Sequence, residues 1–493
     1  MLKSIVFEDS IFQILPDETL AAVLQRNNIP LPLECGGKNR CGRCKIRLLS
    51  GIYRSDEGIF EVSPDSPVDK NACSLRLVST RGHACRIPVS NQPSAIPLPD
   101  FPLLKKIKPA FQGTAVVIDA GTTMVAGVLL ENGKIKRYAE EINAQTAAAD
   151  NIIDRIARTA SPGGREYIHL LLLQKTTIPL MEKLLSHGEQ VEKIIVSGNS
   201  AMSCFFFNAD SSSLGKAPYE PDEKEFSAQA GFLGLRNVPP ETPVQAVPGI
   251  AGFIGGDIAA GLTVSGFGDP EKNELFIDLG TNCEMVLNVR GKYFASAAAA
   301  GPAFERGNLR SDLSGTLRHI QRKENCWLWE PVLAHPNGFC ATGLIDYLAQ
   351  MRKYGYLDSN GQWQNKPDLP ENLILPAGQI AELLTAKAAI ASCLQLLLET
   401  AGINIMDLQT VYLAGNISTN LNLQNAKELH LLPDLPDDAF CKLGNTALAG
   451  AAAIALDPEL ERRASAWQYT VQHINPATLR HYQQYFTRHM LLN

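Results

Sequence analysis

Residues 114–134 read TAVVIDAGTTMVAGVLLENGK. The apolar start predicts a buried strand that ends at Asp119, and a second apolar run after a short turn predicts the strand that returns. Gly121 lets backbone N–H groups approach phosphate oxygens, while Thr122 and Thr123 bring hydroxyl donors. The carboxylate of Asp119 can hold Mg2+ directly or through water. The segment therefore predicts a hairpin that binds the phosphates of a nucleotide.

The same pattern returns at residues 274–292, which read ELFIDLGTNCEMVLNVRGK. An apolar strand again ends in an acid, Asp278, and the turn again carries Gly280 and Thr281, followed here by Asn282. One such pattern is equally well explained by a plain hairpin turn, but two patterns that each lie between apolar strands indicate a duplication. We expect two halves that face each other across a cleft, each giving one hairpin to the phosphates.

A third element follows the apolar helix predicted for residues 379–400, which Gly402 would end. The next predicted strand, TVYLA, breaks at Gly415, and a polar loop leads into another helix. A glycine at such a strand–loop–helix junction leaves room for an adenine ring beside the cleft. Lys387 lies on the preceding helix, where it either flanks that ring or is solvated.

Three cysteines lie close together in CGGKNRCGRC, residues 35–44, with the spacing C-x5-C-x2-C. Thiolates hold iron–sulfur clusters, and plant-type ferredoxins use a C-x4-C-x2-C run with a distant fourth cysteine. The surrounding segments predict strand, strand, helix, cysteine-rich loop and strand, which is the order of a β-grasp ferredoxin. Cys35, Cys41 and Cys44 are therefore candidate ligands of a 2Fe–2S cluster, and a structural zinc site is the less favoured alternative.

The fourth ligand of this cluster is either Cys73 or Cys85. The distance of Cys73 from Cys44 along the chain is close to that of plant-type ferredoxins, whereas Cys85 lies in GHACRIPV, which predicts a short strand. We favour Cys85 and keep Cys73 as the alternative.

The composition limits the classes of protein that the chain can belong to. At about 150 residues per domain, 493 residues predict about three domains. A net charge of -6 leaves no basic excess to neutralise phosphates, so we expect no nucleic-acid partner. The first residues lack the apolar core of a signal peptide, and no apolar run reaches about 18 residues, so we expect no membrane span. Eleven cysteines are then interpreted as reduced thiols and cluster ligands, which favours the cytoplasm.

A series of short motifs resembles the ASKHA superfamily of acetate and sugar kinases, heat-shock chaperones and actin. With a ferredoxin in front, the chain is similar to one branch of it, the ATP-dependent reductive activators of corrinoid-dependent enzymes. The resemblance covers nearly the whole chain and is carried, in this order, by CGGKNRCGRC, DAGTTMVAG, INAQTAAADNIIDRI, VSGNSAMSCFF, LGKAPYEP, VPGIAGFIGGDIAAG, FIDLGTNCEMVL, AAAGPAFERG, TGLID, LLTAKAAI and LGNTALAGAAAIAL.

The resemblance implies an α/β protein with an α+β module at its N-terminus. Residues 1–89 would form a β-grasp 2Fe–2S ferredoxin domain, and residues 90–113, with five prolines, a linker. A duplicated ASKHA fold of the RNase H-like type would follow, with its first half at 114–265 and its second half at 266–493, including a C-terminal helical tail.

The resemblance also implies a function. The protein would return inactive cobalt(II) to cobalt(I) in the corrinoid protein of a methyltransferase system, with an electron from the 2Fe–2S cluster and with ATP and Mg2+ bound in the cleft. An upstream donor would reduce the cluster. Asp119 and Asp278 would act in ATP turnover, and the nucleotide would contact Gly121, Thr122, Thr123, Gly280, Thr281, Asn282, Lys387, Gly415 and Asn416.

Three alternatives stay open at this point. The chain could activate another redox or radical enzyme, phosphorylate a small molecule with the iron–sulfur domain as an accessory, or serve as an ATP-gated chaperone. Self-association into a homodimer is also left open.

Three departures from the family pattern bear on these expectations. The adenosine loop reads AGNIS where the family has a Gly-Gly-Phe-Gly-like run, so Asn416 either tightens the purine pocket or weakens nucleotide affinity. The usual GTNGE is GTNCE here, which places Cys283 beside a phosphate loop. The segment between Cys44 and Cys85 is longer than usual and contains Cys73, which is why the fourth ligand has two candidates.

We predict that replacing Cys85 by Ser removes the cluster, because a 2Fe–2S centre needs all four thiolates. The Cys73→Ser variant is the matched control and should keep its iron content and its visible absorption. Loss of the cluster in Cys73→Ser with retention in Cys85→Ser would reverse the assignment.

Overall fold

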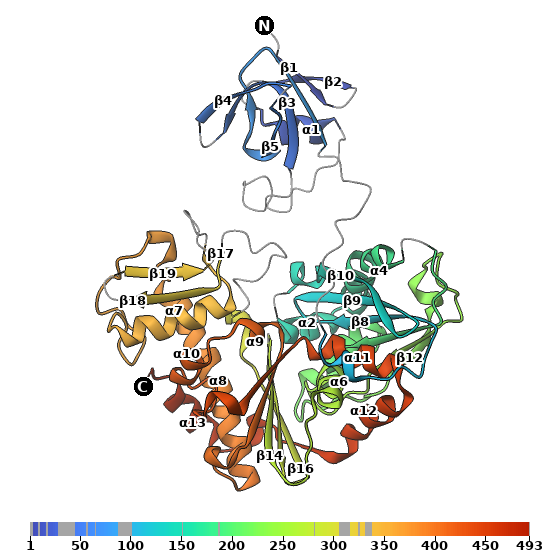
Figure 1. The fold of residues 1–493 in the computed structure, drawn as a ribbon, viewed down its shortest axis with the longest axis vertical. Coiled ribbons are helices and arrows are strands. Elements are labelled where there is room, and N and C mark those ends of the chain that lie inside the picture. The colour runs from blue at the N-terminus through green and yellow to red at the C-terminus, as the bar shows by residue number, and fades with distance from the viewer. Residues whose placement is uncertain are drawn as a thin grey trace. The chain divides into compact units, whose positions relative to one another are not determined.

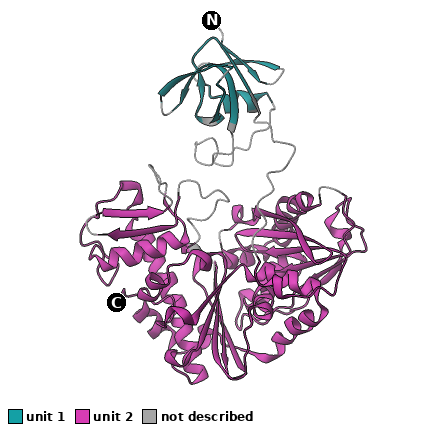
Figure 2. Cartoon of the chain, viewed as in Figure 1, with its two compact units in different colours: residues 1–96 teal, residues 97–493 magenta. Residues whose placement is uncertain are grey.

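The computed structural model describes residues 3–7, 10–15, 18–27, 45–55, 58–64, 66–86, 101–149, 151–185, 188–280, 282–304, 316–323, 326–330 and 338–492. The chain divides into two compact units, residues 1–96 and 97–493, which Figure 2 shows in teal and magenta.

Unit 1 is a small mixed sheet with one helix packed on it. The sheet has the order β2-β1-β7-β3-β4, in which β1 and β7 are parallel, and β5 and β6 pair with β3. The elements are β1 (Lys3–Phe7), β2 (Ser10–Ile14), α1 (Leu20–Arg26), β3 (Lys45–Ser55), β4 (Gly58–Val62), β5 (Val68–Asn71), β6 (Arg76–Leu77) and β7 (Arg81–Arg86).

The core of unit 1 follows from the spacing of its apolar residues. Leu20, Val23 and Leu24 lie on one face of α1, and all three are buried against the sheet. Tyr53 is also fully buried, and its hydroxyl donates to the Ser50 carbonyl at 2.7 Å, which satisfies its polar end. Strand, strand, helix and strand follow in the predicted order, as a β-grasp ferredoxin requires.

The candidate cluster ligands lie only partly within the described structure. Cys35, Cys41 and Cys44 are outside the described residues. The backbone of Cys73 belongs to a short 3-10 turn, Ala72–Ser74, and the backbone of Cys85 lies on β7, opposite Arg47 of β3. The choice between the two stays a prediction.

Unit 2 contains two six-stranded sheets that share a core of five strands with the same topology. The core orders are β10-β9-β8-β11-β13, with β12 beside β13, and β16-β15-β14-β21-β22, with β23 beside β16. In each core three antiparallel strands come first along the chain, and two later strands, β11 and β13 or β21 and β22, pair in parallel beside the first of the three. The predicted duplication is therefore confirmed.

The strands of the first sheet are β8 (Thr114–Ala120), β9 (Met124–Glu131), β10 (Lys134–Ile142), β11 (Lys193–Ser197), β12 (Ser227–Gln229) and β13 (Pro243–Ala246). Those of the second sheet are β14 (Asn273–Leu279), β15 (Cys283–Val289), β16 (Lys292–Ala298), β21 (Thr410–Ala414), β22 (Phe440–Gly444) and β23 (Val471–His473).

The helices of the first half are α2 (Ile152–Thr159), α3 (Gly164–Leu172), α4 (Ile178–Leu184), α5 (Ser200–Phe206) and α6 (Gly256–Ser265). Those of the second half are α7 (Ala341–Lys353), α8 (Ala377–Ala401), α9 (Asn416–Asn420), α10 (Leu423–Glu428), α11 (Thr446–Leu456), α12 (Pro458–Thr470) and α13 (Tyr482–His489).

Two helices rich in small residues, α6 and α11, pack against each other between the sheets (Figure 1). A side chain at Gly450 of α11 would lie 2.2 Å from the carbonyl oxygen of Ala260, and one at Gly261 of α6 would lie 2.6 Å from the hydroxyl of Thr446. Because only glycine allows this approach, the two halves meet at a closely packed contact.

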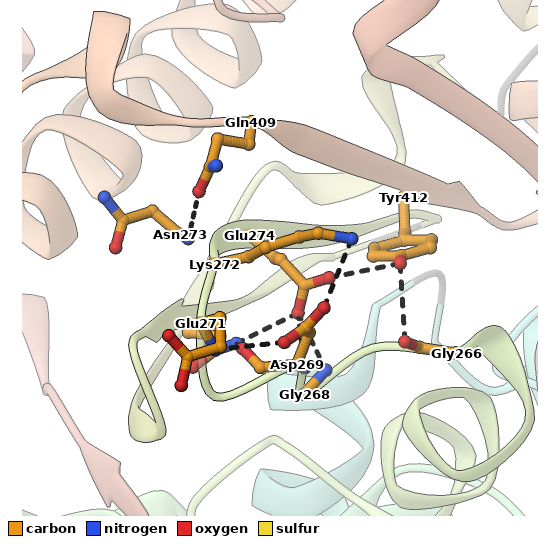
Figure 3. A network of polar contacts seen from close by, with 10 residues as sticks. Gly266, Gly268, Asp269, Glu271, Lys272, Asn273, Glu274, Gln409 and Tyr412 are labelled. Atoms are coloured by element: carbon orange, nitrogen blue, oxygen red, sulfur yellow. Dashed lines mark hydrogen bonds and ion pairs between the residues drawn. The ribbon is translucent and has the colours of Figure 1, made fainter.

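A buried carboxylate fixes the loop that joins the two halves (Figure 3). Glu274, at the start of β14, accepts from the backbone N–H groups of Gly268 and Asp269 at 2.8 and 3.0 Å and from the Tyr412 hydroxyl at 3.2 Å. The amide of Asn288 donates to the same carboxylate at 2.9 Å. The connection from α6 to β14 is thus tied to the second sheet.

Helix α8 forms the centre of the second half. It ends at Gly402, whose φ of 70° is the left-handed conformation that the predicted stop signal requires. The segment Glu371–Ala401 is the one described stretch long and apolar enough to cross a membrane, but 78% of its most apolar window is buried in the protein, as a core helix would be.

The part of the predicted linker that the structure describes, residues 101–113, packs on unit 2. Phe101 joins the core between the sheets, and the N–H groups of Ala110 and Phe111 donate to the Leu456 carbonyl at 2.9 and 3.0 Å. The ammonium group of Lys193 lies 3.8 Å from the centre of the Phe111 ring. Proline content alone predicted a tether here, whereas the apolar residues between the prolines anchor this part of the segment.

A small lobe extends from the second half. It contains α7 and four short strands, β17 (Thr316–Leu317), β18 (His319–Lys323), β19 (Cys326–Glu330) and β20 (Gly338–Phe339). Figure 1 shows the β18–β19 hairpin lying over α7. We call the described residues 316–323, 326–330 and 338–353 the hairpin lobe.

Candidate nucleotide-binding site

Unit 2 contains a cavity of about 450 Å³ to which both sheets contribute. The described residues that line it are Asp119, Gly121, Thr122, Thr123, Met124, Glu140, Asn199, Asp257, Asp278, Leu279, Gly280, Asn282, Glu284, Arg318, Cys340, Ala341, Thr342, Gly415, Asn416, Ile417, Asn420, Asn445 and Ala447. Both predicted hairpins and the predicted adenosine loop therefore meet at one place. Thr281 lies outside the described residues.

The first hairpin presents Asp119 and the turn after it. Asp119 lies near the end of β8, opposite Ser197 of the parallel strand β11. A Cβ atom at Gly121 would lie 2.4 Å from the Met124 carbonyl oxygen, so no larger residue fits this turn. The buried hydroxyl of Thr122 accepts from the side-chain amide of Asn199 at 3.2 Å.

Two buried polar side chains, Asn143 and Arg155, hold this turn through its carbonyl oxygens, and we call them the polar platform. The side-chain amide of Asn143 donates to the Gly121 carbonyl at 3.0 Å, and the backbone N–H of Asn143 donates to the Thr123 carbonyl at 2.9 Å. The Arg155 guanidinium donates to the Thr122 carbonyl at 2.8 Å. Asn143 and Arg155 are both fully buried, so the carbonyl oxygens of three successive loop residues are held in place. The motif INAQTAAADNIIDRI thus acquires a structural role.

The second hairpin brings Asp278 and Glu284 together. The two residues pair across β14 and β15, and Asp278 also pairs with Ala414 of β21. The N–H of Gly280 donates to the Asn282 carbonyl at 3.0 Å, which closes the turn.

The adenosine loop lies directly against the second hairpin. Gly415 has a φ of +84°, and a Cβ atom there would lie 2.4 Å from the Leu279 carbonyl oxygen and 2.7 Å from a carboxylate oxygen of Asp278. Asn416 lines the cavity as the first residue of α9. The glycine is therefore required by the phosphate hairpin itself and not only by space for a base.

Four carboxyl groups of the cavity have raised pKa values, and burial is the largest cause in each case. The pKa of Asp119 rises to about 6 although Asn445 and Ser197 donate to its carboxylate. The pKa of Asp278 rises to about 7 through burial and the charge of Asp119. Asp257, in the first turn of α6, has a pKa of about 8 through burial and the charge of Asp278, and the pKa of Glu284 lies well above its usual range.

A cation bound beside these carboxylates would lower their pKa values again, because it favours the charged form. Carboxylates and threonine hydroxyls are oxygen donors, which suit Mg2+. Among the described residues no three His, Cys, Asp or Glu side chains are placed to ligate one metal ion. A Mg2+ ion here would therefore take most of its ligands from water and phosphate oxygens, as Mg2+ commonly does.

Asn445 links the first hairpin to α11 of the other half. Its side-chain N–H donates to the carboxylate of Asp119 at 3.0 Å, and its side-chain oxygen accepts from the N–H of Leu448 at 2.9 Å, which caps the helix. Asn199 caps α5 in the same way, accepting from Met202 at 3.0 Å. The residue predictions missed Asn199, Asn445, Asp257 and Glu284.

A sequence signal for the two asparagines exists. The segments SGNSA at 197–201 and LGNTA at 443–447 repeat a Gly-Asn-Ser/Thr-Ala pattern after a strand, and the first two residues recur at Gly415 and Asn416. Asn before a helix is a capping signal, and its repetition marks the helix starts around the cavity.

Lys387 is a correction to the predicted site. It does not line the cavity, and its side chain is 1% exposed inside the second half. Its ammonium group donates to the carbonyls of His489, at 2.9 Å, and Leu491. Burial lowers the pKa of Lys387 to about 8. The lysine therefore fastens the C-terminal segment to α8 instead of flanking an adenine ring.

Three family models match consecutive parts of the chain. The 2Fe–2S iron–sulfur cluster binding domain matches residues 8–89, the RACo middle region matches 114–269, and the C-terminal domain of RACo, its ASKHA domain, matches 272–493.

The chain is also similar to individual proteins along most of its length. The corrinoid activation enzyme RamQ of Eubacterium limosum is 25% identical over 552 aligned positions, which cover 91% of this chain and 92% of that protein. The [Co(II) methylated amine-specific corrinoid protein] reductase of Methanosarcina barkeri is 24% identical over 54% of this chain and 56% of its own length. A solved structure of a reductive activator for corrinoid,iron-sulfur protein shares the fold, with a TM-score of 0.69 and 20% identity over 99% of this chain and 98% of that one.

We predict that Gly415→Ala abolishes ATP binding, because the new methyl group would collide with Leu279 and Asp278 and displace the second hairpin. The matched control is Gly402→Ala, which has a similar φ of +70° but open space around it. Backbone strain should lower the unfolding free energy by roughly 1 kcal/mol in both variants, and the collision should lower it further in Gly415→Ala. Only Gly415→Ala should lose ATP affinity by calorimetry, and equal affinities in both variants would contradict the role of the close contact.

We also predict that Mg2+ stabilises the folded protein more at pH 8 than at pH 6. The raised pKa values of Asp119, Asp278 and Asp257, from about 6 to about 8, mean that the folded protein holds protons which the unfolded chain has released. Their contribution to stability is therefore lost as the pH rises through these values, and a cation replaces the protons.

The measurement is the thermal unfolding midpoint with and without MgCl2 at each pH. Asp257→Asn keeps a neutral group at the position and should reduce both the loss of stability with pH and the gain from Mg2+. An equal gain from Mg2+ at both pH values would show that these carboxylates do not meet the ion.

Proposed function

The chain belongs to the RACo family, and on that premise we propose that it is a reductive activator that returns the cobalt(II) of a corrinoid protein to cobalt(I). The observation that carries the ATP-dependent part of this proposal is the cavity of unit 2, where two topologically equivalent hairpins present Asp119 and Asp278 to one space. The observation that carries the electron-transfer part is the match of residues 8–89 to a 2Fe–2S domain.

Within unit 2, the turns at Gly121 and Gly280 bind the phosphates of ATP, and Asp119 and Asp278 hold the Mg2+ ion that accompanies them. The cavity offers backbone N–H groups and hydroxyls to phosphate oxygens and carboxylates to the metal. The Asn143 and Arg155 platform keeps the first turn in the phosphate-binding shape. Asn445 holds the carboxylate of Asp119 and orients it.

Electron transfer to the corrinoid needs help from ATP because the cluster is a moderate reductant. Plant-type clusters have potentials near roughly -400 mV. For one electron about 59 mV changes an equilibrium tenfold, so an acceptor lying ~150 mV lower opposes transfer by ~3.5 kcal/mol. Nucleotide binding and hydrolysis alternately favour closed and open arrangements of the two halves, and a partner that is bound by one arrangement is held in a more easily reduced state.

Several components of the proposal lie outside this chain. The partner is a corrinoid protein of a methyltransferase system, and a separate electron donor must reduce the cluster again after each transfer. The use of ATP and the reduced cysteines favour the cytoplasm for this reaction.

We predict that Asp278→Asn abolishes ATP-dependent formation of cobalt(I), because the variant removes a charge that faces the metal. The assay is anaerobic and follows the absorption of a cobalt(II) corrinoid protein after reduction of the cluster, with ATP–Mg2+ or with ADP–Mg2+. The wild type should produce cobalt(I) faster and in higher yield with ATP, and Asp278→Asn should not.

Asp438→Asn is the matched control, because Asp438 is an exposed acid that does not line the cavity. It should behave as the wild type does, and the visible spectrum of the cluster should be unchanged in both variants. A wild-type yield of cobalt(I) that does not depend on ATP would sink the proposal.

A further inference from the structure

One cation lines the cavity among its described residues. The described lining includes five acids, Asp119, Glu140, Asp257, Asp278 and Glu284, and a single Lys or Arg, which is Arg318. Arg318 lies between β17 and β18 of the hairpin lobe, beside Cys340, Ala341 and Thr342 of the lining. It therefore belongs to a different part of the cavity wall from the two phosphate hairpins.

The backbone of Arg318 is fixed on both sides. Its N–H donates to the Glu330 carbonyl at 2.6 Å, and its carbonyl accepts from the Thr342 hydroxyl at 2.7 Å. Thr342 is buried at the start of α7, and the N–H of Cys340 donates to the Leu317 carbonyl at 3.0 Å. The side chain is exposed, and within the described part of the chain no hydrogen bond or ion pair occupies its guanidinium. Arg318 thus has a fixed backbone and a guanidinium that makes no hydrogen bond or ion pair with the described residues, and it lines a cavity rich in acids.

The chemistry of a nucleotide triphosphate fits this arrangement. Burial raises the pKa values of four cavity acids, neighbouring carboxylates raise those of Asp278, Asp257 and Glu284 further, and no cation of the protein is among the groups that act on them. A triphosphate entering this space needs positive charge on more than one side. Mg2+ supplies it beside Asp119 and Asp278, and a planar guanidinium can bind the remaining phosphate oxygens through two parallel hydrogen bonds.

We propose that Arg318 binds the terminal phosphate of ATP and that the hairpin lobe thereby distinguishes ATP from ADP. This inference deepens the proposed function and rests on it for the presence of ATP in the cavity. The two phosphate hairpins belong to the repeated sheets and bind the phosphates together with Mg2+. The inference gives the hairpin lobe a separate role, which is recognition of the terminal phosphate.

The lobe is also connected to the adenosine side of the cavity. His319, the next residue after Arg318, contacts the Asp346 carboxylate of α7 through Nδ1 at 2.8 Å. The other oxygen of this buried carboxylate accepts from the Asn425 amide of α10 at 2.6 Å. Helix α10 follows α9, whose residues Asn416 and Asn420 line the cavity. Arg318 is therefore linked through α7 and α10 to α9, which lines the adenosine side of the cavity in the proposed function. A movement of Arg318 toward a phosphate would act on these helices.

The β18–β19 hairpin packs closely against α7 and the segment after it, so we expect it to move together with Arg318 as a rigid unit. The guanidinium of Arg322 lies 5.2 Å from the ring centre of Tyr354, 5.5 Å from that of Tyr356 and 5.9 Å from that of Trp327. The N–H of Arg322 donates to the Gln350 side chain of α7 at 3.0 Å. Strand β18 is thus fastened to α7 within four residues of Arg318.

The test is calorimetric titration of the full-length protein with ATP–Mg2+ and, separately, with ADP–Mg2+. The wild type should bind ATP more tightly than ADP. Arg318→Ala should lower the affinity for ATP by roughly 10- to 100-fold and leave the affinity for ADP within about 2-fold, because a charge-assisted bidentate contact to the terminal phosphate is lost. Arg318→Lys keeps the charge but cannot form two parallel hydrogen bonds, so its affinity for ATP should lie between those of the wild type and Arg318→Ala.

Lys323→Ala is the matched control, since Lys323 is an exposed cation on the same hairpin that does not line the cavity. It should bind both nucleotides as the wild type does. An equal loss for ATP and ADP in Arg318→Ala, or no loss at all, would overturn the inference, and an equal loss in Lys323→Ala would reduce it to a general charge effect and overturn it as well.

The outcome separates this inference from the proposed function. If wild-type protein reduces the corrinoid with ATP but Arg318→Ala keeps its preference for ATP over ADP, only the assignment of Arg318 is wrong. If Arg318→Ala loses that preference while wild-type protein fails to use ATP in cobalt reduction, Arg318 binds the terminal phosphate as inferred and the proposed function is wrong. Absence of ATP binding by the wild type would overturn both.

Discussion

The burial of carboxylates from both halves in one cavity is the constraint on which the site of the second unit depends. Asp119 lies on one sheet, Asp278 on the other, and Asp257 on the helix α6 between them. Burial raises all three pKa values, the charge of Asp119 raises those of Asp278 and Asp257 further, and the charge of Asp278 raises that of Asp257 as well. Without a nearby cation, burial and the neighbouring negative charges favour the protonated form of these carboxyl groups or a larger distance between them. The Mg2+ ion of a bound nucleotide would offset the charge of these carboxylates where the two halves meet, and it would also offset part of the negative charge that the triphosphate brings. Ligand occupancy and the distance between the halves are therefore coupled through electrostatics, before any specific contact to the nucleotide is considered.

The fold turns this coupling into a defined motion. The two sheets share the order of their five core strands, and their equivalent hairpins both line the cavity. Between them, the contact of α6 and α11 at Gly261 and Gly450 permits almost no gap, and Glu274 holds the connecting loop at the edge of the second sheet. Because a closely packed contact resists separation more than it resists small rotations, we expect the halves to rotate about α6 and α11.

The sequence predicted those parts of the site that depend on neighbouring residues along the chain. Asp119 with Gly121, and Asp278 with Gly280, stand in a local strand–turn–strand pattern that determines its own geometry. Asp257 could not be found in that way, because it lies at the start of a helix whose position is set by packing between the sheets, whereas Asn445 has a local signal in the repeated Gly-Asn pattern. Lys387 was misplaced for the same reason: α8 is buried on most of its surface, so its sequence gives no polar face from which the direction of one lysine could be read.

The cavity and the iron–sulfur match belong to different compact units of the chain. Every described residue of the cavity lies between Asp119 and Ala447, within unit 2, whereas the match to the iron–sulfur domain ends at residue 89. A ligand shifts an equilibrium only by its differential affinity for the two states. We therefore expect ATP to change electron transfer through the conformation of unit 2, which a partner protein that binds unit 2 and receives the electron can sense. On this reasoning the corrinoid partner is itself part of the coupling, and nucleotide turnover without it should leave the properties of the cluster unchanged.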